Sequence, residues 1–165
     1  MRPKTAPRTR SDVQPKGMWF EQFEVGDVHD HALTRTITEA DNVLFTTQTM
    51  NPAPLHLDAA YAATTPFGKP LVNSLLTLGM VVGISVHELT HGTTVANLGF
   101  ETITFPAPLF HGDTIRVETE VVSTRASKSK PSQGIVGLEH RAFNQDDVLV
   151  CSARRNALMH RRPAD

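Results

Sequence analysis

Hydrophobic and polar residues alternate along four segments in the second half of the chain, residues 93–104, 114–123, 134–144 and 148–159. An alternation with a period of two is typical of β-strands that bury one face. Turn-forming residues separate these segments, at positions 106–108, 111–113, 130–132 and 144–147. The second half is therefore predicted to be an antiparallel meander.

A long apolar segment, residues 72–89, precedes these strands. Apolar residues lie on most sides of the helix that it predicts, and Gly79 and Gly83 are spaced one helical turn apart. A helix that is apolar all round is expected to be buried. Because glycine weakens a helix interior, the pair predicts a close approach by another backbone.

Shorter elements are predicted in the first half. Residues 32–37 alternate as a strand does. Thr38 is a good N-cap residue and is followed by acidic residues, so a helix is predicted from there to about residue 49. A second, short helix is predicted over residues 58–63. The first helix is expected to turn these residues toward the core: Val43, Leu44 and Phe45.

One buried helix combined with an antiparallel meander predicts an α+β fold in which a curved sheet wraps the helix. We expect one domain over residues 18–160, between polar, disordered tails at 1–17 and 161–165. A single sheet of this kind has open edges. A homodimer that continues the sheet is therefore the expected assembly.

Charge and composition exclude several classes of function. The formal net charge is −1, so no overall field attracts nucleic acid or an anionic membrane. The longest apolar run, residues 75–86, is too short and too interrupted to span a bilayer. A single cysteine, Cys151, excludes an intramolecular disulfide framework and suits a reducing cytoplasm.

The most informative stretch is residues 49–62, where one histidine follows a loop that contains two prolines. Pro52 and Pro54 restrict the backbone around them, so Asn51 and His56 can be held at a fixed separation. Acid–base chemistry on a small substrate needs such a pair, and histidine can both take and give a proton near neutral pH. Alternatively, His56 is an ordinary surface or core residue, and Asn51 only forms the turn before Pro52.

This stretch resembles the active-site segment of the MaoC-like enoyl-CoA hydratases and dehydratases, which have a hot-dog fold. The resemblance covers residues 18–158. Two departures matter: Asn51 stands where the family has its catalytic Asp, and Ala53 stands where the family has an Asn. The positions that match are Phe45, Thr49, Pro54, Leu55, His56, Asp58 and Ala62.

A second match lies at residues 67–76, where many family members have His-Gly and this chain has Asn73-Ser74. That replacement resembles the subgroup acting on itaconyl-CoA, mesaconyl-CoA or methylmalyl-CoA. The resemblance implies that His56 activates water, that Asn51 holds it, and that the Ser74 N–H stabilises the enolate oxygen. The Asn73 amide could meet a substrate carboxylate, or both residues could simply cap the helix.

Basic residues gather in the last third of the chain. Arg125, Lys128, Lys130 and Arg154, with Arg155 beside the last, could form a rim for the phosphates of CoA. Ordinary surface solvation explains them equally well. A basic strand edge for RNA is less favoured, because no aromatic residues are interleaved with them.

The remaining polar residues predict no further chemistry. Asp58 is expected to cap a helix, and Glu39 to be a first-turn acid. His91, His111 and His140 lack ligand spacing, so no metal site is predicted. Nucleotide-binding glycine motifs and the Gly-x-Ser-x-Gly elbow do not occur in the sequence. No cofactor is expected beyond the CoA of the substrate.

The sequence therefore predicts a hydratase or dehydratase that adds water to, or removes it from, the C2–C3 bond of an acyl-CoA thioester. Two alternatives stay open. A hot-dog thioesterase is the alternative enzyme, although it needs a carboxylate beside the thioester carbonyl. Because Asn51 replaces the catalytic Asp, a non-catalytic acyl-CoA-binding subunit is the other.

Overall fold

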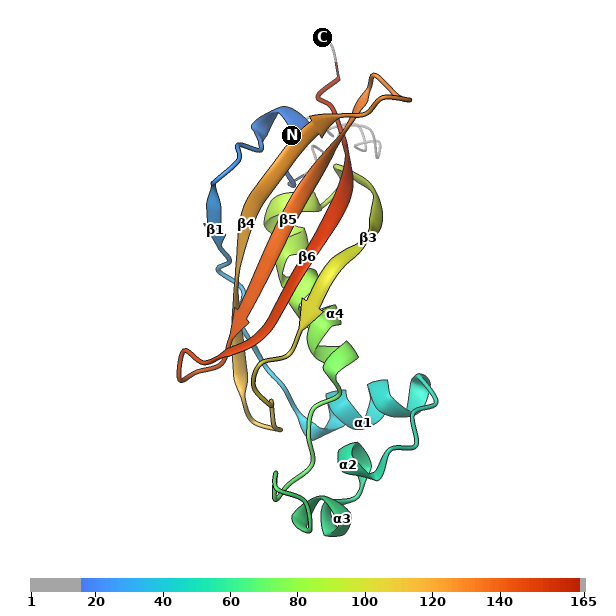
Figure 1. Cartoon of the computed structure of the whole chain (residues 1–165), viewed down its shortest axis with the longest axis vertical. Helices are drawn as coiled ribbons and strands as arrows, with labels where there is room; N and C mark the ends of the chain where they lie inside the picture. Colours follow the sequence, from blue (N-terminus) through green and yellow to red (C-terminus); the bar gives the residue numbers. More distant parts are fainter. Residues whose placement is uncertain (1–15, 164–165) are drawn as a thin grey trace, which may run out of the picture.

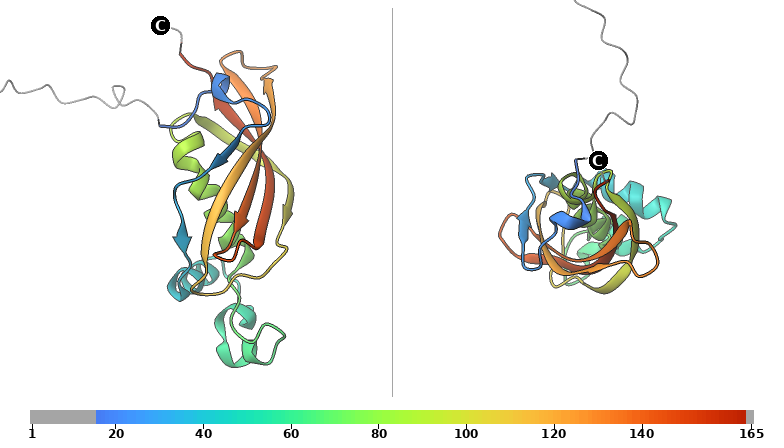
Figure 2. Two further views of the ribbon diagram at one scale, coloured as in Figure 1. Left: turned by 90° about the vertical axis from the view of Figure 1, so that its left-hand side faces the viewer. Right: turned by 90° about the horizontal axis from the view of Figure 1, so that it is seen from above.

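The computed structural model describes residues 16–163, in which an antiparallel sheet curves around one long helix (Figures 1 and 2). The strands follow the order β1-β4-β5-β6-β3, and β2 pairs with β4. Their bounds are β1 Val28–Asp30, β2 Arg35–Thr36, β3 Thr94–Thr104, β4 Thr114–Ala126, β5 Gln133–Phe143 and β6 Leu149–His160.

Helix α4 packs on the inner face of this sheet, while the shorter helices α1 to α3 lie together at one end of the molecule (Figure 1). A 3-10 turn, η2, precedes the first strand, and a π-helical turn, η3, continues α4. Their bounds are η2 Phe20–Gln22, α1 Glu39–Gln48, α2 Pro54–Leu57, α3 Ala59–Ala63, α4 Ser74–Ser85 and η3 Val86–Thr90.

The core lies between α4 and the inward-facing residues of β4, β5 and β6. On β6, for example, Cys151, Ala153, Arg155, Ala157 and Met159 are buried, while the residues that alternate with them are partly exposed. Small residues on this face leave room for the helix, whose Val81 is fully buried. This arrangement is the sheet wrapped round a helix that the sequence predicts.

The four strands predicted in the second half are confirmed as β3 to β6. The sequence predicts that the long helix is buried on all sides, and within one copy of the protein this prediction is wrong for α4. Leu75, Gly79 and Gly83 lie one turn apart on an exposed stripe of α4. Apart from the adjacent residues and the backbone of α4 itself, no atom of the described residues would lie within 4 Å of a Cβ added at either glycine. The predicted close approach is therefore not made within this chain.

The first half differs more from its prediction. Helix α1 begins after Thr38, whose side chain accepts from the Asp41 N–H in a capping box. However, Val43 and Leu44 are exposed, and the buried residues of α1 are the polar Asn42 and Thr46. The predicted strand at 32–37 is reduced to the two residues of β2, and the strand β1 and the helix α2 were not predicted.

The two predicted tails fall largely outside the described residues, which exclude 1–15 and 164–165. At the other boundary, Arg161 donates from its backbone to Ser132, and Arg162 to the Glu21 carboxylate. The packed fold therefore extends past residue 160. Between residues 16 and 163, no helix is long and apolar enough to cross a membrane.

Candidate active site

His56 lies in α2, the single-turn helix that Pro54 begins. Its Nδ1 atom is 3.0 Å from the backbone oxygen of Leu71. A carbonyl oxygen can only accept a hydrogen bond, so Nδ1 carries the proton and Nε2 has a free lone pair. The ring is half-buried. This tautomer is the one that lets Nε2 act as a general base.

The acceptor for His56 is itself held in place. Leu71 donates its N–H to Leu55 at 3.1 Å, and Val72 donates to Leu109 at 2.9 Å. Leu71 also pairs with Phe110 in an isolated β-bridge. The segment that leads into α4 is therefore fixed on both sides, as a positioned catalytic side chain requires.

Helix α4 begins at Ser74, with Asn73 as its N-cap. The Asn73 oxygen accepts from the Leu75 N–H at 3.0 Å, whereas the Ser74 N–H has no acceptor among the described residues. Free N–H groups and the positive end of the dipole favour negative charge at a helix start. Ser74 thus provides the type of donor that an enolate oxygen needs.

Asn73 is only 3% exposed, and its amide is committed within the protein. The oxygen caps α4, and Nδ2 lies 3.4 Å from the hydroxyl of Thr46. These contacts favour the capping role over the substrate-binding role. Because Asn73 is buried, a substrate carboxylate could reach this amide only if the surrounding residues moved, so its role in binding stays a prediction for kinetics to test.

A cavity of about 350 Å³ lies against the start of α4. Its walls are mostly apolar, with Ser74 and Thr77 as the polar side chains. Leu71, whose carbonyl holds His56, is also part of the wall. The other side is formed by the segment between β3 and β4, including Phe105 and Leu109. The size and lining suit a small, mostly apolar group.

Asn51 follows the end of α1 directly. Met50 has a positive φ of 56°, and the N–H groups of Met50 and Asn51 bond back to Thr47 and Thr46 in a Schellman motif. The Asn51 side-chain oxygen accepts from the Ala53 N–H at 3.0 Å. Asn51 therefore forms the predicted turn, and its NH₂ group remains as a donor for a water molecule.

The basic residues predicted to bind CoA do not gather near His56 within one chain. The β4–β5 turn, with Lys128 and Lys130, lies at the end of the sheet opposite α2 (Figure 1). Arg125 is near the end of β4, and Arg154 lies 3.7 Å from the carboxylate of Glu101 on β3. Contact between these side chains and CoA remains a prediction.

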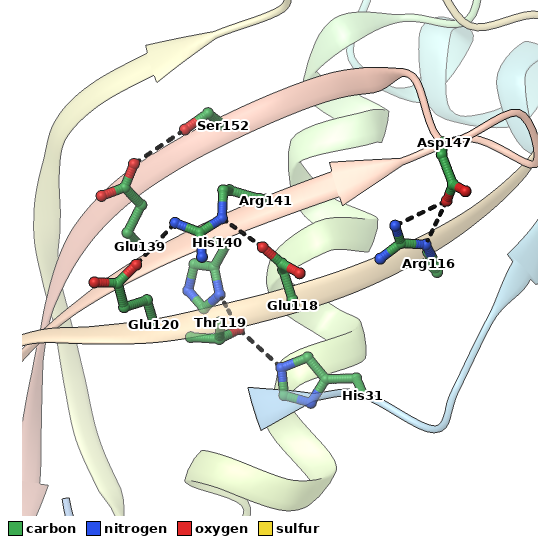
Figure 3. A network of polar contacts seen from close by, with 10 residues as sticks. All are labelled: His31, Arg116, Glu118, Thr119, Glu120, Glu139, His140, Arg141, Asp147 and Ser152. Atoms are coloured by element: carbon green, nitrogen blue, oxygen red, sulfur yellow. Dashed lines mark hydrogen bonds and ion pairs between the residues drawn. The ribbon is translucent and has the colours of Figure 1, made fainter. Parts of the chain in front are cut away.

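Arg155 does not belong to a surface rim, because it is 4% exposed. It belongs instead to a network of polar side chains that the sequence did not predict. Figure 3 shows the His31, Thr119 and His140 part of this network. Arg155 Nε donates to His140 Nε2 at 2.8 Å, and His140 Nδ1 lies 2.8 Å from the Thr119 hydroxyl. That hydroxyl is also 2.8 Å from His31 Nε2, and His31 Nδ1 is 2.6 Å from Glu88.

The buried Arg155 determines which atoms donate and which accept in this series of hydrogen bonds. Because His140 Nε2 accepts from Arg155, the proton of neutral His140 lies on Nδ1. Burial first, and then the charge of Arg155, lower the pKa of His140 to about 3. Burial alone would raise the pKa of Glu88, but the hydrogen bonds from His31 and Ala32 hold it below its usual value. Sequence spacing carries no sign of these contacts, since they depend on strand register.

The model of the MaoC-like domain family matches residues 21–143 of this chain. The chain belongs to that family. Its curated relatives include a mesaconyl-CoA hydratase from Haloarcula marismortui, 31% identical over 94% of this chain and 44% of the relative. A β-methylmalyl-CoA dehydratase from Chloroflexus aurantiacus is 30% identical over 88% of the chain and 41% of the relative. This MaoC-like chain thus spans less than half the length of these relatives.

An (R)-specific enoyl-CoA hydratase from Aeromonas caviae has a more similar length. It is 32% identical over 81% of the MaoC-like chain and 92% of that relative. Both the general family and the similarity to the mesaconyl-CoA hydratases, predicted from residues 49–62 and 67–76, are therefore confirmed.

Solved structures confirm the hot-dog fold. A putative MaoC domain dehydratase from Chloroflexus aurantiacus superposes with a TM-score of 0.85 at 29% identity, over 91% of this chain and 42% of that one. A Mycobacterium tuberculosis protein with a double hotdog fold gives a TM-score of 0.81 at 27% identity, over 93% of this chain and 47% of that one. The chain corresponds in length to one half of each.

Proposed function

We propose that this chain is a hydratase or dehydratase acting at the C2–C3 bond of an acyl-CoA thioester. The observation that carries the proposal is the hydrogen bond from His56 Nδ1 to Leu71, which leaves Nε2 as a free base. Leu71 lies three residues before Ser74, so the carbonyl that holds the base and the free N–H of the oxyanion donor belong to the same short segment. Family membership and the names of the relatives support the same reaction.

In the hydration direction, the Asn51 amide holds a water molecule that gives a proton to His56 Nε2 while its oxygen bonds to C3. The π electrons of the C2–C3 bond move toward C2 and the thioester oxygen. The Ser74 N–H stabilises the resulting enolate charge. His56 then returns the proton to C2, and dehydration follows these steps in reverse.

The substrate that we propose carries a short branched or dicarboxylic acyl group of the itaconyl-CoA, mesaconyl-CoA or methylmalyl-CoA type. Support comes from the relatives that are named for mesaconyl-CoA and β-methylmalyl-CoA. A cavity of about 350 Å³ beside Ser74 is large enough for such a group. No cofactor besides the CoA of the substrate enters this proposal.

A panel of crotonyl-CoA and mesaconyl-CoA, each incubated with the purified protein, tests the proposal. Hydration of either substrate, absent in His56→Ala, is the expected result. Release of free CoA would instead identify a thioesterase. Binding without turnover would identify an acyl-CoA-binding subunit, the role that replacement of the catalytic Asp by Asn51 would explain.

We propose a homodimer in which β3 meets the β3 strand of a second copy. Among residues 16–163, strand β3 is the last strand of the sheet and pairs only with β6. All of its residues are exposed, including the apolar Val95, Leu98, Phe100 and Ile103. An exposed apolar edge strand of this length is normally covered. A second copy would supply the second half that the double hot-dog relative carries in one chain.

A reducing cytoplasm is the location that we propose. The only cysteine, Cys151, is buried, and burial raises the pKa of its thiol to about 11. Such a thiol is a structural residue and not a reactive one.

A further inference from the structure

Asn42 is fully buried on α1, and its side chain contacts four residues from three other segments of the chain. Its Nδ2 lies 3.0 Å from the backbone oxygen of Leu71 and 3.3 Å from that of His56. The same nitrogen is 3.0 Å from His111 Nε2, in the turn before β4. On the other side, its Oδ1 accepts from the Asn73 N–H at 2.8 Å.

The orientation of this amide is fixed by its backbone partners. The two carbonyl oxygens can only accept, so they require the NH₂ group, and the Asn73 N–H requires the oxygen. An apolar residue would leave these buried groups unsatisfied, and an aspartate would direct an oxygen at two carbonyls. Asparagine is therefore the side chain that satisfies both sides at once.

These contacts join the two halves of the site. The Leu71 oxygen that Asn42 holds is the one that accepts from His56 Nδ1, so Asn42 helps to fix the base and its tautomer. The Asn73 N–H that Asn42 also holds belongs to the residue just before the Ser74 oxyanion donor. One buried amide thus sets the separation between base and donor.

The neighbouring contact on α1 points the same way. Thr46, one helical turn after Asn42, accepts from the Asn73 side chain at 3.4 Å. The buried face of α1 is thus polar and is directed at the start of α4, while apolar Leu44 is 58% exposed. A helix that served only the core would bury its apolar residues instead.

We propose that Asn42 is a positioning residue for the reaction, which holds the His56 ring and the start of α4 in register. This inference rests on the proposed function for its kinetic consequence, but not for its structural one. Asn42 touches neither water nor substrate in this role. Misplacement of reacting groups by about 1 Å can cost on the order of 100-fold in rate.

The test compares Asn42→Ala and Asn42→Asp with Thr119→Val as the matched control. Thr119→Val also removes a buried hydrogen-bonding side chain, but from the His31–His140 chain away from His56. In Asn42→Ala, kcat for hydration should fall by about 10- to 100-fold with KM changed less than about threefold. In Thr119→Val, kcat should stay within about twofold of the wild type at a temperature where both are folded.

Nitrogen NMR of the imidazole rings provides a readout that needs no activity. The wild type should show His56 in the single Nδ1–H tautomer, and Asn42→Ala should show a mixture of tautomers, while Thr119→Val keeps the wild-type signal. An unchanged His56 signal in folded Asn42→Ala or Asn42→Asp overturns the proposal, whatever the rates are. A loss of kcat no larger than in Thr119→Val also overturns it.

Failure of the proposed function is recognised separately. If the wild type hydrates none of the acyl-CoA probes, the activity proposal fails, and the NMR comparison alone decides whether Asn42 positions His56.

Discussion

At the scale of single residues, the His56 ring depends on one hydrogen bond to a backbone oxygen that leaves Nε2 free. His56→Ala should lower kcat/KM for enoyl-CoA hydration by about 10²- to 10⁴-fold, the usual contribution of a general base. The melting temperature should hardly change, because the ring is only half-buried. Steady-state kinetics and thermal unfolding measure both effects. Turnover near the wild-type rate would contradict the mechanism.

Asn51→Asp tests the departure from the family's usual residue. One carboxylate oxygen can still accept from the Ala53 N–H, so the turn and the melting temperature should be kept. The other oxygen can take a proton, which the amide cannot do. We expect kcat/KM to be maintained or raised for crotonyl-CoA and lowered for mesaconyl-CoA, because like charges repel. An equal change for both substrates would remove the repulsion argument.

Asn73→Ala separates capping from substrate binding. The side chain is buried and caps α4 at 3.0 Å, so its loss should lower the free energy of unfolding by about 1 kcal/mol. Because its amide is already engaged, kcat/KM should fall by a similar factor for crotonyl-CoA and mesaconyl-CoA. Denaturant unfolding and kinetics on both substrates provide the measurements. A loss restricted to mesaconyl-CoA would support the carboxylate contact predicted from sequence.

At the scale of elements, the sequence predicts those with regular burial and misses those built by polar contacts. Strands β3 to β6 alternate with a period of two, so their positions follow from the pattern alone. Helix α1 has its boundaries predicted by Thr38, but not its buried face. Apolar periodicity cannot identify Asn42 and Thr46 as buried, because their partners lie on the Leu71–Asn73 segment.

The site shows the same division. The Pro-containing motif and the family resemblance identify His56. The helix α2 that carries it is not predicted, because it is a single turn and its first residue, Pro54, is also typical of a loop. The hydrogen bond that selects the His56 tautomer joins residues far apart in the sequence, as does every hydrogen bond of the Asn42 side chain. The buried polar chain from Arg155 to Glu88 likewise depends on the register of β4, β5 and β6.

At the scale of the whole molecule, that polar chain makes stability depend on pH. His140 has a pKa of about 3 in the folded protein, against 6.5 for an ordinary histidine. Between these values the unfolded chain binds a proton that the folded chain does not, so stability falls as pH decreases below 6.5. The slope from this residue should be about 1.4 kcal/mol per pH unit.

Denaturant unfolding from about pH 6.5 to 5.5, above the usual range of the carboxyl groups, measures this slope. His140→Gln cannot take up the proton, so its stability should change less with pH over the same interval. Equal slopes for the wild type and His140→Gln would show that His140 is not the group responsible.

Assembly is the last property to be decided at this scale. The apolar side chains of β3 are open to solvent, and Leu98 is 49% exposed there. If β3 meets its copy in a dimer, Leu98→Lys introduces a charge into that interface and should weaken it at least about tenfold, equivalent to about 1.4 kcal/mol.

Val25→Lys is the matched control, since Val25 is 62% exposed but lies before β1, at the other edge of the sheet. Sedimentation equilibrium should give a dimer for the wild type and Val25→Lys, and a shift toward monomer for Leu98→Lys. A monomeric wild type, or equal effects of the two lysines, would mean that another surface or another partner covers β3.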